Sequence, residues 1–207
     1  MFQREIEELY YFQSKERLRN KFTNVKQDRK SIMLYDFADF KWVLIPEDLH
    51  SIRNDDLDLY NKLDPSKIMF LSNPQFDDID QTCNCRRLDE KDRYEFEEFH
   101  NACPQKDKDQ GMVSIADPVV YGCFVEGKIV SVASLWNWGE RLSDIGVLTH
   151  PKFRNNGYAE NVCKRLMYEN NKLFIWRCDE KNDVSYNLAK RLGFSKAGMI
   201  YSLKKKS

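Results

Sequence analysis

The chain has 207 residues, enough for one large domain or for an ordinary domain with a smaller one. Its 33 Lys and Arg balance 33 Asp and Glu, so it lacks the overall basic charge typical of nucleic-acid-binding proteins. No segment approaches the roughly 20 consecutive apolar residues of a membrane span, and the start, MFQREIEELYYFQ, has no uninterrupted apolar run. We therefore expect a cytoplasmic protein, with neither nucleic acid nor membrane as a partner, whose six cysteines are thiols.

The first part of the chain predicts a small α+β segment. Residues 3–20 carry apolar residues at helical spacing, and SIMLYDF and KWVLI are typical of two short strands. Pro46 then stands at the start of a predicted helix, and KIMFLSN predicts another strand. The apolar face of that helix would contain Leu49, Ile52, Leu57, Tyr60 and Leu63. The acidic stretch 73–81 predicts a boundary between two parts, residues 1–81 and 82–207.

The second part predicts strands and helices in the order β α β β β α β α β. TCNCRRL is typical of a strand, and the following helix places Phe96, Phe99 and Cys103 on one side. VVYGCFV and KIVSVASLW flank Glu-Gly and predict a hairpin. LSDIGVL and KLFIWRC predict further strands, and residues 159–167 predict a helix with one apolar stripe. NDVSYNLAKRLGF predicts a helix capped by Asn182. This alternation indicates an α+β, layered fold with helices on a sheet.

The loop before residue 159 has the features of an anion site. It leaves a predicted strand through Pro151 and enters a predicted helix just after Gly157. The first N–H groups of a helix have no intrahelical partner and lie at the positive end of its dipole. Arg154 adds a guanidinium that can fork onto phosphate oxygens, and Gly157 leaves room for a diphosphate. A plain strand-to-helix turn would have the same sequence.

Two motifs together are more specific than this loop. Residues 147–159 read VLTHPKFRNNGYA, and residues 182–194 follow the pattern N..S...A..LGF. Over residues 82–203 the chain resembles the GNAT superfamily of N-acetyltransferases, whose signature Arg/Gln-x-x-Gly-x-Gly/Ala is matched by Arg154, Gly157 and Ala159. The resemblance implies a mixed, mostly antiparallel central sheet flanked by helices. Residues 1–81 would be an N-terminal α+β extension outside the family pattern.

The resemblance implies a site for acetyl-CoA as co-substrate, without a metal. The pyrophosphate is expected on the loop amides, and the pantetheine arm on the splayed end of the preceding strand, where Gly146 is expected to mark a bulge. Two polar residues of the second motif are expected beside the thiol end of the cofactor. The implied cofactor-binding residues are Val147, Leu148, Thr149, Arg154, Asn155, Asn156, Gly157, Tyr158, Ala159, Asn182 and Ser185.

The implied reaction is direct attack of a primary amine on the thioester in a ternary complex. A backbone N–H near Leu148 would hold the oxyanion. Asp144 is a candidate base, because related enzymes often carry a carboxylate on this strand, although an ion pair with Arg141 would explain it equally well. The usual tyrosine acid of the family is replaced by Ala189.

Two other tyrosines are candidate acids. Tyr186 is on the same predicted helix as Ala189, and Tyr201 is on the final predicted strand. The thiol of CoA is also acidic enough for the sulfur to leave with the help of water. We therefore expect that Tyr186 is not required for most of the turnover.

The cysteines leave one alternative open. Cys83, Cys85, His100 and Cys103 supply four potential zinc ligands, but Cys-x-Cys is not the usual zinc spacing, and two thiols on a strand simply share a face. Core thiols are the simpler interpretation.

Two classes of function fit the sequence. The first is an N-acetyltransferase that acts on the amine of a small molecule or peptide. The second is a non-catalytic acyl-CoA-binding or sensing module. In either case, IMLYDFADFKWVLI is too apolar for a disordered tail. We expect residues 1–81 to pack against the sheet and to form one wall of the acceptor site.

Overall fold

The computed structural model describes residues 2–15, 17, 20–73 and 84–207. The predicted boundary at 73–81 lies almost wholly outside these ranges. Within them, no helix has the length and apolar character needed to cross a membrane.

The N-terminal part is a small sheet covered by one helix. Its elements are α1 (Gln3–Ser14), β1 (Phe22–Gln27), β2 (Ile32–Phe37) and β3 (Lys41–Pro46). β2 and β3 pair antiparallel, which confirms the predicted strand pair, and β1 pairs parallel with β3. The predicted helix ends at Ser14 rather than near residue 20, because Lys15 adopts a left-handed conformation. Its buried residues, Ile6, Leu9 and Tyr10, are those with helical spacing.

The helix predicted from Pro46 is wrong. Pro46 ends β3, a short 3₁₀ helix covers Asn54–Leu59, and β4 (Tyr60–Leu71) follows directly. Ile52 and Leu57 are buried as predicted, but from a loop and the 3₁₀ turn rather than from one helical face. β4 is longer than the predicted strand because it has a partner on each side, β10 (Phe194–Lys205) and β9 (Leu173–Asp179).

The C-terminal part follows the predicted alternation and adds one helix. Its elements before β9 are β5 (Asn84–Arg87), α2 (Arg93–Asn101), α3 (Gln105–Gly111), β6 (Val119–Val125), β7 (Lys128–Trp138), β8 (Leu142–Thr149) and α4 (Tyr158–Tyr168). α5 (Asp183–Arg191) lies between β9 and β10. The hairpin of β6 and β7 turns at Glu126 and Gly127, as predicted, and both have positive φ. α3 was not predicted, because QKDKDQG has no apolar stripe.

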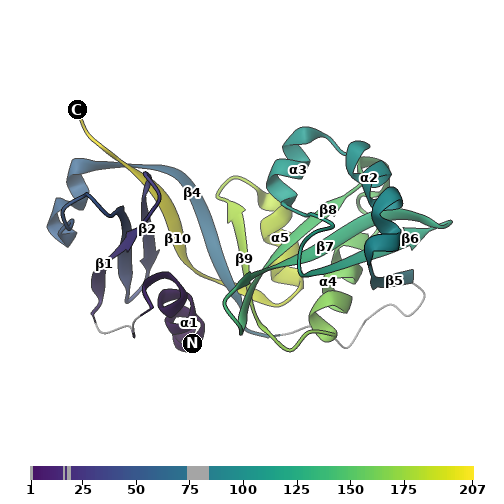
Figure 1. Cartoon of the computed structure of the whole chain (residues 1–207), viewed down its shortest axis with the longest axis horizontal. Coiled ribbons are helices and arrows are strands. Elements are labelled where there is room, and N and C mark those ends of the chain that lie inside the picture. Colours follow the sequence, from purple (N-terminus) through teal and green to yellow (C-terminus); the bar gives the residue numbers. More distant parts are fainter. Residues whose placement is uncertain (1, 16, 18–19, 74–83) are drawn as a thin grey trace.

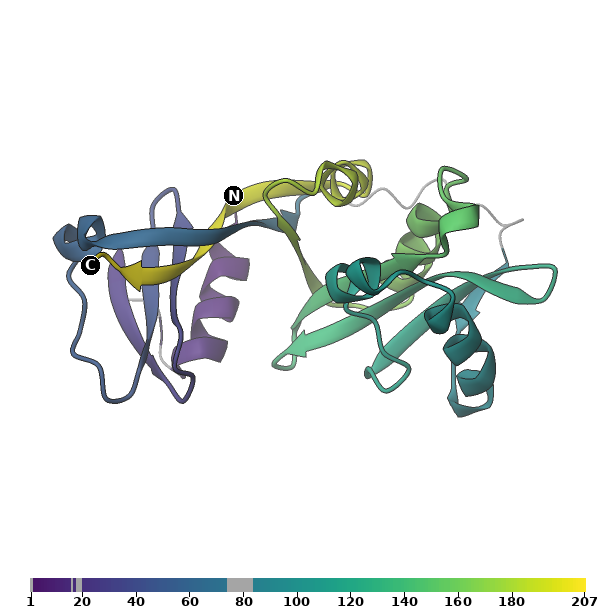
Figure 2. The ribbon, with the colours of Figure 1, turned by 90° about the horizontal axis from the view of Figure 1, so that it is seen from above.

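All strands of the described residues belong to one ten-stranded sheet in the order β1-β3-β2-β10-β4-β9-β8-β7-β6-β5. The sheet is mixed and mostly antiparallel, and among these strands only β1 with β3 and β8 with β9 are parallel. The long strands β4 and β10 connect an N-terminal lobe to a C-terminal lobe (Figure 1), and Figure 2 shows the same bridge from above. The last strand of the chain thus completes the N-terminal lobe.

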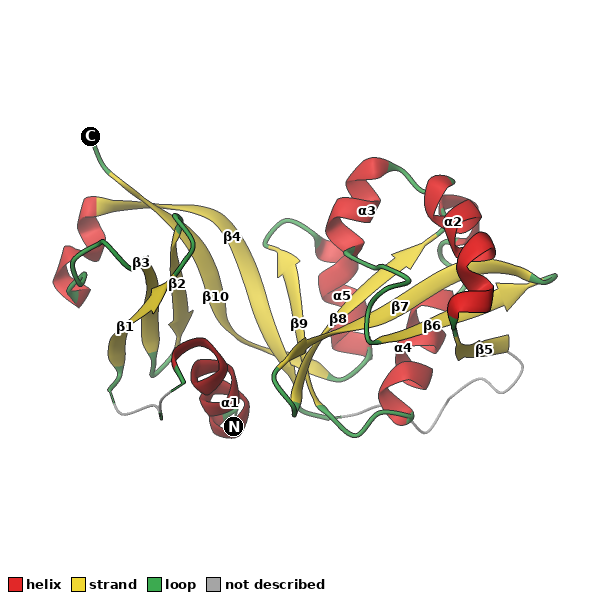
Figure 3. Ribbon diagram, viewed as in Figure 1, coloured by secondary structure: helices red, strands yellow, loops and turns green. Residues whose placement is uncertain are grey.

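The helices of the C-terminal lobe cover both faces of its strands (Figure 3). One core lies under α4 and α5, where Val162, Leu166 and Leu188 pack with Ile145 of β8. Another lies under α2, where Phe96 and Phe99 pack with neighbours that include Leu148 of β8. Successive residues of β8 therefore face different helical layers. This arrangement places the end of β8 between α3 on one side and α5 on the other.

Candidate functional site

The central feature of the site is a gap between β8 and β9. The two strands pair in parallel only from Leu142 to Asp144, opposite Leu173 to Ile175. Beyond this point β9 runs along β4, whereas β8 stays on β7 up to Thr149. The predicted splay is therefore present, and no described strand pairs with the backbone of β8 on the β9 side after Asp144.

The splay does not begin at a bulge, so the predicted role of Gly146 is wrong. The β7–β8 register continues through the pair Ser134–Gly146 without a shift. Gly146 is small for a different reason: a Cβ there would lie 2.6 Å from the carbonyl oxygen of Gly111 at the end of α3. In turn, a Cβ on Gly111 would lie 2.6 Å from the carbonyl oxygen of Val147. Both glycines are needed for α3 to pack directly on β8.

The strand geometry shows which amides of β8 face the gap. The N–H of His150 donates to the carbonyl of Val130 on β7, at 2.9 Å. Backbone N–H groups alternate sides along a strand, so the N–H of Leu148 also faces β7, whereas those of Val147 and Thr149 face the gap. We therefore expect the oxyanion donor predicted near Leu148 to be the N–H of Val147 or of Thr149.

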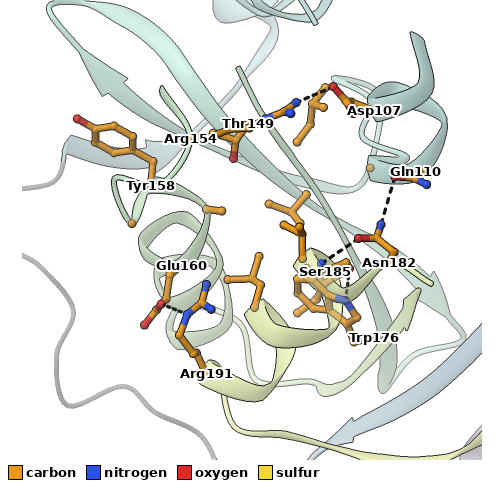
Figure 4. Close-up of a pocket in the computed structure, with 18 of the residues that line it drawn as sticks. Asp107, Gln110, Thr149, Arg154, Tyr158, Glu160, Trp176, Asn182, Ser185 and Arg191 are labelled. Carbon is orange, nitrogen blue, oxygen red and sulfur yellow. Dashed lines mark hydrogen bonds and ion pairs between the residues drawn. The ribbon is translucent and has the colours of Figure 1, made fainter. Parts of the chain in front are cut away.

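A pocket with a volume of about 510 Å³ lies where the strands separate. It is lined by the end of β8, the loop before α4, parts of α3 and α5, and β9 (Figure 4). All of the predicted cofactor-binding residues except Asn156 line it. The lining residues that the sequence did not single out are Asp107, Gln110, Gly111, Ile145, Phe153, Glu160, Trp176, Arg177, Val184, Leu188 and Arg191.

The loop before α4 has the backbone expected of an anion site. Gly157 is the N-cap of α4 with a φ of 79°, and Asn155 also has a positive φ of 63°. Asn156 turns back on the loop instead of lining the pocket, because its side-chain amide donates to the carbonyl of Arg154, at 2.9 Å. The first amides of α4 thus open toward the pocket at the positive end of the helix dipole.

Arg154 is held by a residue of α3. Its guanidinium contacts the carboxylate of Asp107 at 2.6 Å, and the Arg154 side chain is 44% exposed. Gln110, one turn further along α3, accepts a hydrogen bond from the side-chain amide of Asn182, at 3.2 Å. α3 therefore contacts both the loop before α4 and the start of α5 (Figure 4).

The two polar residues of the second motif have structural partners at the pocket wall. Asn182 caps α5, as predicted, because its side-chain oxygen accepts a hydrogen bond from the N–H of Ser185, at 3.0 Å. The hydroxyl of Ser185 accepts a hydrogen bond from the indole N–H of Trp176, at 2.9 Å. Both still line the pocket, so the cap and a contact with a bound molecule are compatible.

A second group of charged side chains lies where the first turn of α4 approaches α5. Glu160 in the first turn of α4 contacts Arg191 of α5 at 2.9 Å and Lys164 at 3.1 Å. Burial alone would raise the pKa of Glu160, but hydrogen bonds from Arg191 and Lys164 outweigh it and lower that pKa. The carboxylate is therefore ionised and neutralised, and it does not oppose an anion at the start of α4.

Asp144 lies beside the gap but has a different partner from the one predicted. Its carboxylate accepts a hydrogen bond from Nε of Arg177 at 2.5 Å, whereas Arg141 pairs with Glu8 of α1. Burial raises the pKa of Asp144, and Arg177 opposes this shift. The Asp144 side chain is only 8% exposed, so the ion pair accounts for its position, and its role as a base stays a prediction.

Neither candidate tyrosine lines the pocket. The ring of Tyr186 lies under the ammonium groups of Lys67 and Lys190, at 4.7 and 5.8 Å. Tyr201 is in the part of β10 that pairs with β2, and Lys62 lies over its ring. Ala189, at the position of the family's tyrosine, is fully buried. Within the residues that the structure describes, Tyr158 is therefore the only tyrosine that lines the pocket.

The cysteines are placed as parts of the core. Burial raises the pKa of Cys163 on α4 and raises that of Cys103 to about 11. His100 stacks on Phe96 at 5.6 Å, and Cys85 lies opposite Cys123 in the β5–β6 register. Cys83 lies outside the described residues. Among those that are described, no three His, Cys, Asp or Glu side chains are grouped to hold a metal.

Comparison with known proteins agrees with this geometry. The family model for GNAT acetyltransferase matches residues 120–201, which contain β8, the loop, α4, β9 and α5. No curated protein matches the chain.

Solved structures of the same fold have low sequence identity. A putative GNAT-family acetyltransferase from Novosphingobium aromaticivorans is 17% identical with a TM-score of 0.52, over 79% of this chain and 73% of that one. A GNAT-family acetyltransferase from Colwellia psychrerythraea is 14% identical with a TM-score of 0.58, over 72% of this chain and 59% of that one. A GCN5-related N-acetyltransferase from Kribbella flavida is 10% identical with a TM-score of 0.51, over 72% and 60% of the two chains.

At such identities the structures show the fold, and the sequence motifs and the family model independently identify the region around the gap. Residues 120–201 carry the splayed strands, the anion loop and the capped helix in the order that the resemblance implied. Residues 120–201 therefore match the GNAT acetyltransferase family, and the C-terminal part that contains them has the GNAT fold.

Proposed function

We propose that the protein is an N-acetyltransferase that transfers an acetyl group from acetyl-CoA directly to a primary amine in a ternary complex. The observation that carries this proposal is the pocket at the β8–β9 gap, which joins unpaired strand backbone to the amino end of α4. A diphosphate suits the loop amides and Arg154, and the peptide-like pantetheine suits the open edge of β8. The acceptor is an amine of a small molecule or peptide.

The edge of β8 also supplies the group needed for thioester chemistry. We propose that the N–H of Val147 or Thr149 donates to the oxyanion that forms when the amine attacks the carbonyl carbon. The amine must lose a proton, and the CoA thiolate leaves as the C–N bond forms. Because Asp144 is tied to Arg177, the proton would pass to Asp144 through water or to bulk water.

A direct assay separates this proposal from a non-catalytic acyl-CoA-binding module. Release of free CoA thiol from acetyl-CoA is measured with and without a panel of primary amines. Amine-dependent release supports catalysis. Binding of acetyl-CoA by calorimetry without release for any amine of the panel favours a sensing module and contradicts the proposed transfer.

Replacing Gly157 by valine should remove acetyl-CoA binding while the fold survives. A Cβ at Gly157 has no atom within 4 Å, so its cost to folding is backbone strain of about 1 to 2 kcal/mol. The same side chain would stand where the diphosphate approaches the loop. We expect calorimetry to show at least about tenfold weaker binding of acetyl-CoA, or about 1.4 kcal/mol.

Gly127 offers a matched control for this variant. It has a similar φ, 76° against 79°, and a Cβ added there would also have no atom within 4 Å, but it lies in the β6–β7 turn away from the pocket. Gly127→Val should lower the melting temperature about as much and leave acetyl-CoA binding unchanged. Equal affinities of the two variants would refute a diphosphate site at Gly157.

Tyr186→Phe should keep most of the turnover, within roughly tenfold of the wild type, whereas loss of a true general acid costs about 10² to 10⁴ in rate. The reason is that the Tyr186 ring packs under two lysines outside the pocket. The measurement is kcat for CoA release together with acetyl-CoA affinity. A loss of more than roughly a hundredfold in kcat at unchanged affinity would assign the acid to Tyr186 and contradict departure with the help of water.

A further inference from the structure

The pocket passes through the sheet at the β8–β9 gap. Ile145 and Trp176 belong to the core under α4 and α5, whereas Ile175 belongs to the core under α1. Side chains alternate along a strand, so Arg177 points to the same face as Ile175. Both Trp176 and Arg177 nevertheless line the pocket. The gap therefore connects the face covered by α5 to the face that also carries α1.

On this second face, Arg177 is a partly buried cation with most of its donors unused. Its Nε donates to Asp144, and its side chain is 32% exposed. A guanidinium has five N–H donors, and within the described part of the chain the four on the terminal nitrogens have no hydrogen-bond partner. A cation in such a position gains most from a planar anion that can take two of these donors at once.

Tryptophans of β7 surround this guanidinium. The ring of Trp138 lies 5.0 Å from Cζ of Arg177. The indole N–H of Trp138 is buried and meets no partner within strict hydrogen-bond geometry, but it is close enough to the Asp144 carboxylate to help stabilise its charged form. Trp136 is directly opposite Asp144 in the β7–β8 register, so it shares this face, and it is 58% exposed. The surroundings thus combine apolar ring surface with the free donors of Arg177.

The N-terminal lobe contributes to the same place. Tyr35 on β2 belongs to the same core as Ile175 of β9, and Trp138 packs against this core. Burial raises the pKa of the Tyr35 hydroxyl, and Arg177 opposes this shift. Tyr35 is fixed by stacking on Trp42, with ring centroids 5.4 Å apart.

We propose that Arg177, with Trp138, Trp136 and Tyr35, binds a carboxylate of the acceptor, so that the acceptor is an amino acid or another small amine that bears a carboxylate. This inference rests on the proposed acetyl transfer. Arg177 is two residues beyond Ile175, the last residue of β9 that pairs with β8, or about 7 Å along the strand. An amine in the gap and a carboxylate on Arg177 can therefore belong to one small molecule.

The first test compares acceptors that differ only in charge. CoA release is measured with amino acids and with the matching amino acid amides, which keep the side chain and the amine but lack the carboxylate. We expect kcat/KM to be higher for the preferred amino acid than for its amide by roughly tenfold or more, the usual scale for a hydrogen bond to a charged group. Amides that serve equally well would overturn the carboxylate site while leaving acetyl transfer intact.

The second test changes Arg177 without leaving Asp144 unpaired. Arg177→Lys keeps the positive charge but loses the planar pair of N–H donors that can bind both oxygens of a carboxylate. We expect KM for the amino acid to rise by roughly tenfold or more, with little change in kcat, in KM for the amide, or in acetyl-CoA affinity. Arg86→Lys is the matched control, because Arg86 also pairs with a carboxylate, Asp92, and lies over an aromatic ring, Phe124, but it is outside the pocket. Weaker acetyl-CoA binding in Arg177→Lys would instead assign Arg177 to the cofactor and overturn the inference.

A binding measurement keeps the two proposals separable if no amine is acetylated. N-acetylated amino acids and their amides, which resemble the product, are titrated by calorimetry into the protein in the presence of CoA. Preference for the carboxylate form, lost in Arg177→Lys, would support the anion site even without turnover. No preference in either transfer or binding would overturn it.

Discussion

Arg154→Ala should weaken acetyl-CoA binding by about 1.5 to 3 kcal/mol, the usual range for a hydrogen bond to a charged group. This corresponds to roughly 10- to 150-fold in Kd. The fold should survive, because Arg154 is 44% exposed and an ion pair of this kind contributes at most about 1 kcal/mol to stability. Calorimetry with acetyl-CoA gives the affinity, and thermal unfolding checks the fold.

A variant of Asp107, the ion-pair partner of Arg154, should not weaken acetyl-CoA binding. Asp107 holds the guanidinium of Arg154, so a diphosphate must compete with this carboxylate. Asp107→Asn should therefore leave acetyl-CoA affinity unchanged or increase it. Arg93→Ala is the control for loss of an exposed, ion-paired arginine elsewhere, since Arg93 pairs with Glu90 at the start of α2. Unchanged affinity in Arg154→Ala would show that the phosphate-loop assignment is wrong.

The structural features around the candidate site that the sequence predicted correctly are those with local signals. Gly157 precedes an amphipathic helix, and the N-cap role of Asn182 depends on an N–H only three residues away. The hairpin turns at Glu126 and Gly127 because positive φ is tolerated there. Each of these features is decided within one turn or one helix, so a short window of sequence contains the physical cause.

The parts that could not be predicted depend on contacts between distant segments. α3 has no apolar stripe of its own and is held by docking of its end on Gly146 and by the pair of Asp107 with Arg154. Gly146 is small because a helix approaches it, a cause that lies outside its own strand. Asp144 pairs with Arg177 across the sheet rather than with the nearby Arg141. No spacing rule along the chain identifies such partners.

The false helix after Pro46 has a similar explanation. Its apolar residues have helical spacing, but the residues from 60 onward are stabilised more by forming β4 than by forming a helix. As β4 they have hydrogen-bonding partners on both edges. Tertiary pairing of this kind overrides local propensity. The same strand explains why the two halves of the chain depend on each other.

Removing residues 1–81 should abolish the soluble fold. β4 stands between β9 and β10, which do not pair with one another, and it supplies Met69 to the core under α4 and α5. Without residues 1–81, β9 loses β4, its remaining partner beside the gap, and β10 loses both of its neighbours, β2 and β4. We expect the fragment 82–207 to be insoluble when expressed alone and to be recovered, at least in part, when residues 1–81 are co-expressed as a separate chain.

A point variant tests the same dependence without removing any strand. Phe70 of β4 is fully buried in the core that contains Ile175 of β9 and residues of α1. Phe70→Ala should lower the free energy of unfolding by about 3 to 5 kcal/mol, the usual cost of removing a large core side chain. Tyr11→Ala on α1 is the control, because Tyr11 is 52% exposed and its loss should change the free energy by about 0.5 kcal/mol or less.

Removal of residues 1–81 should affect acetyl-CoA binding and acceptor use differently. The pocket residues all lie between 107 and 191, so any fragment 82–207 that stays soluble should still bind acetyl-CoA. Its use of acceptors should be lost, because Tyr35 belongs to the removed segment and shares a core with Ile175 and Trp138, beside the proposed site of the acceptor carboxylate. Calorimetry and CoA release on the same sample separate these outcomes. A fragment with full turnover would show that residues 1–81 form no part of the acceptor site and that β4 is dispensable for the sheet.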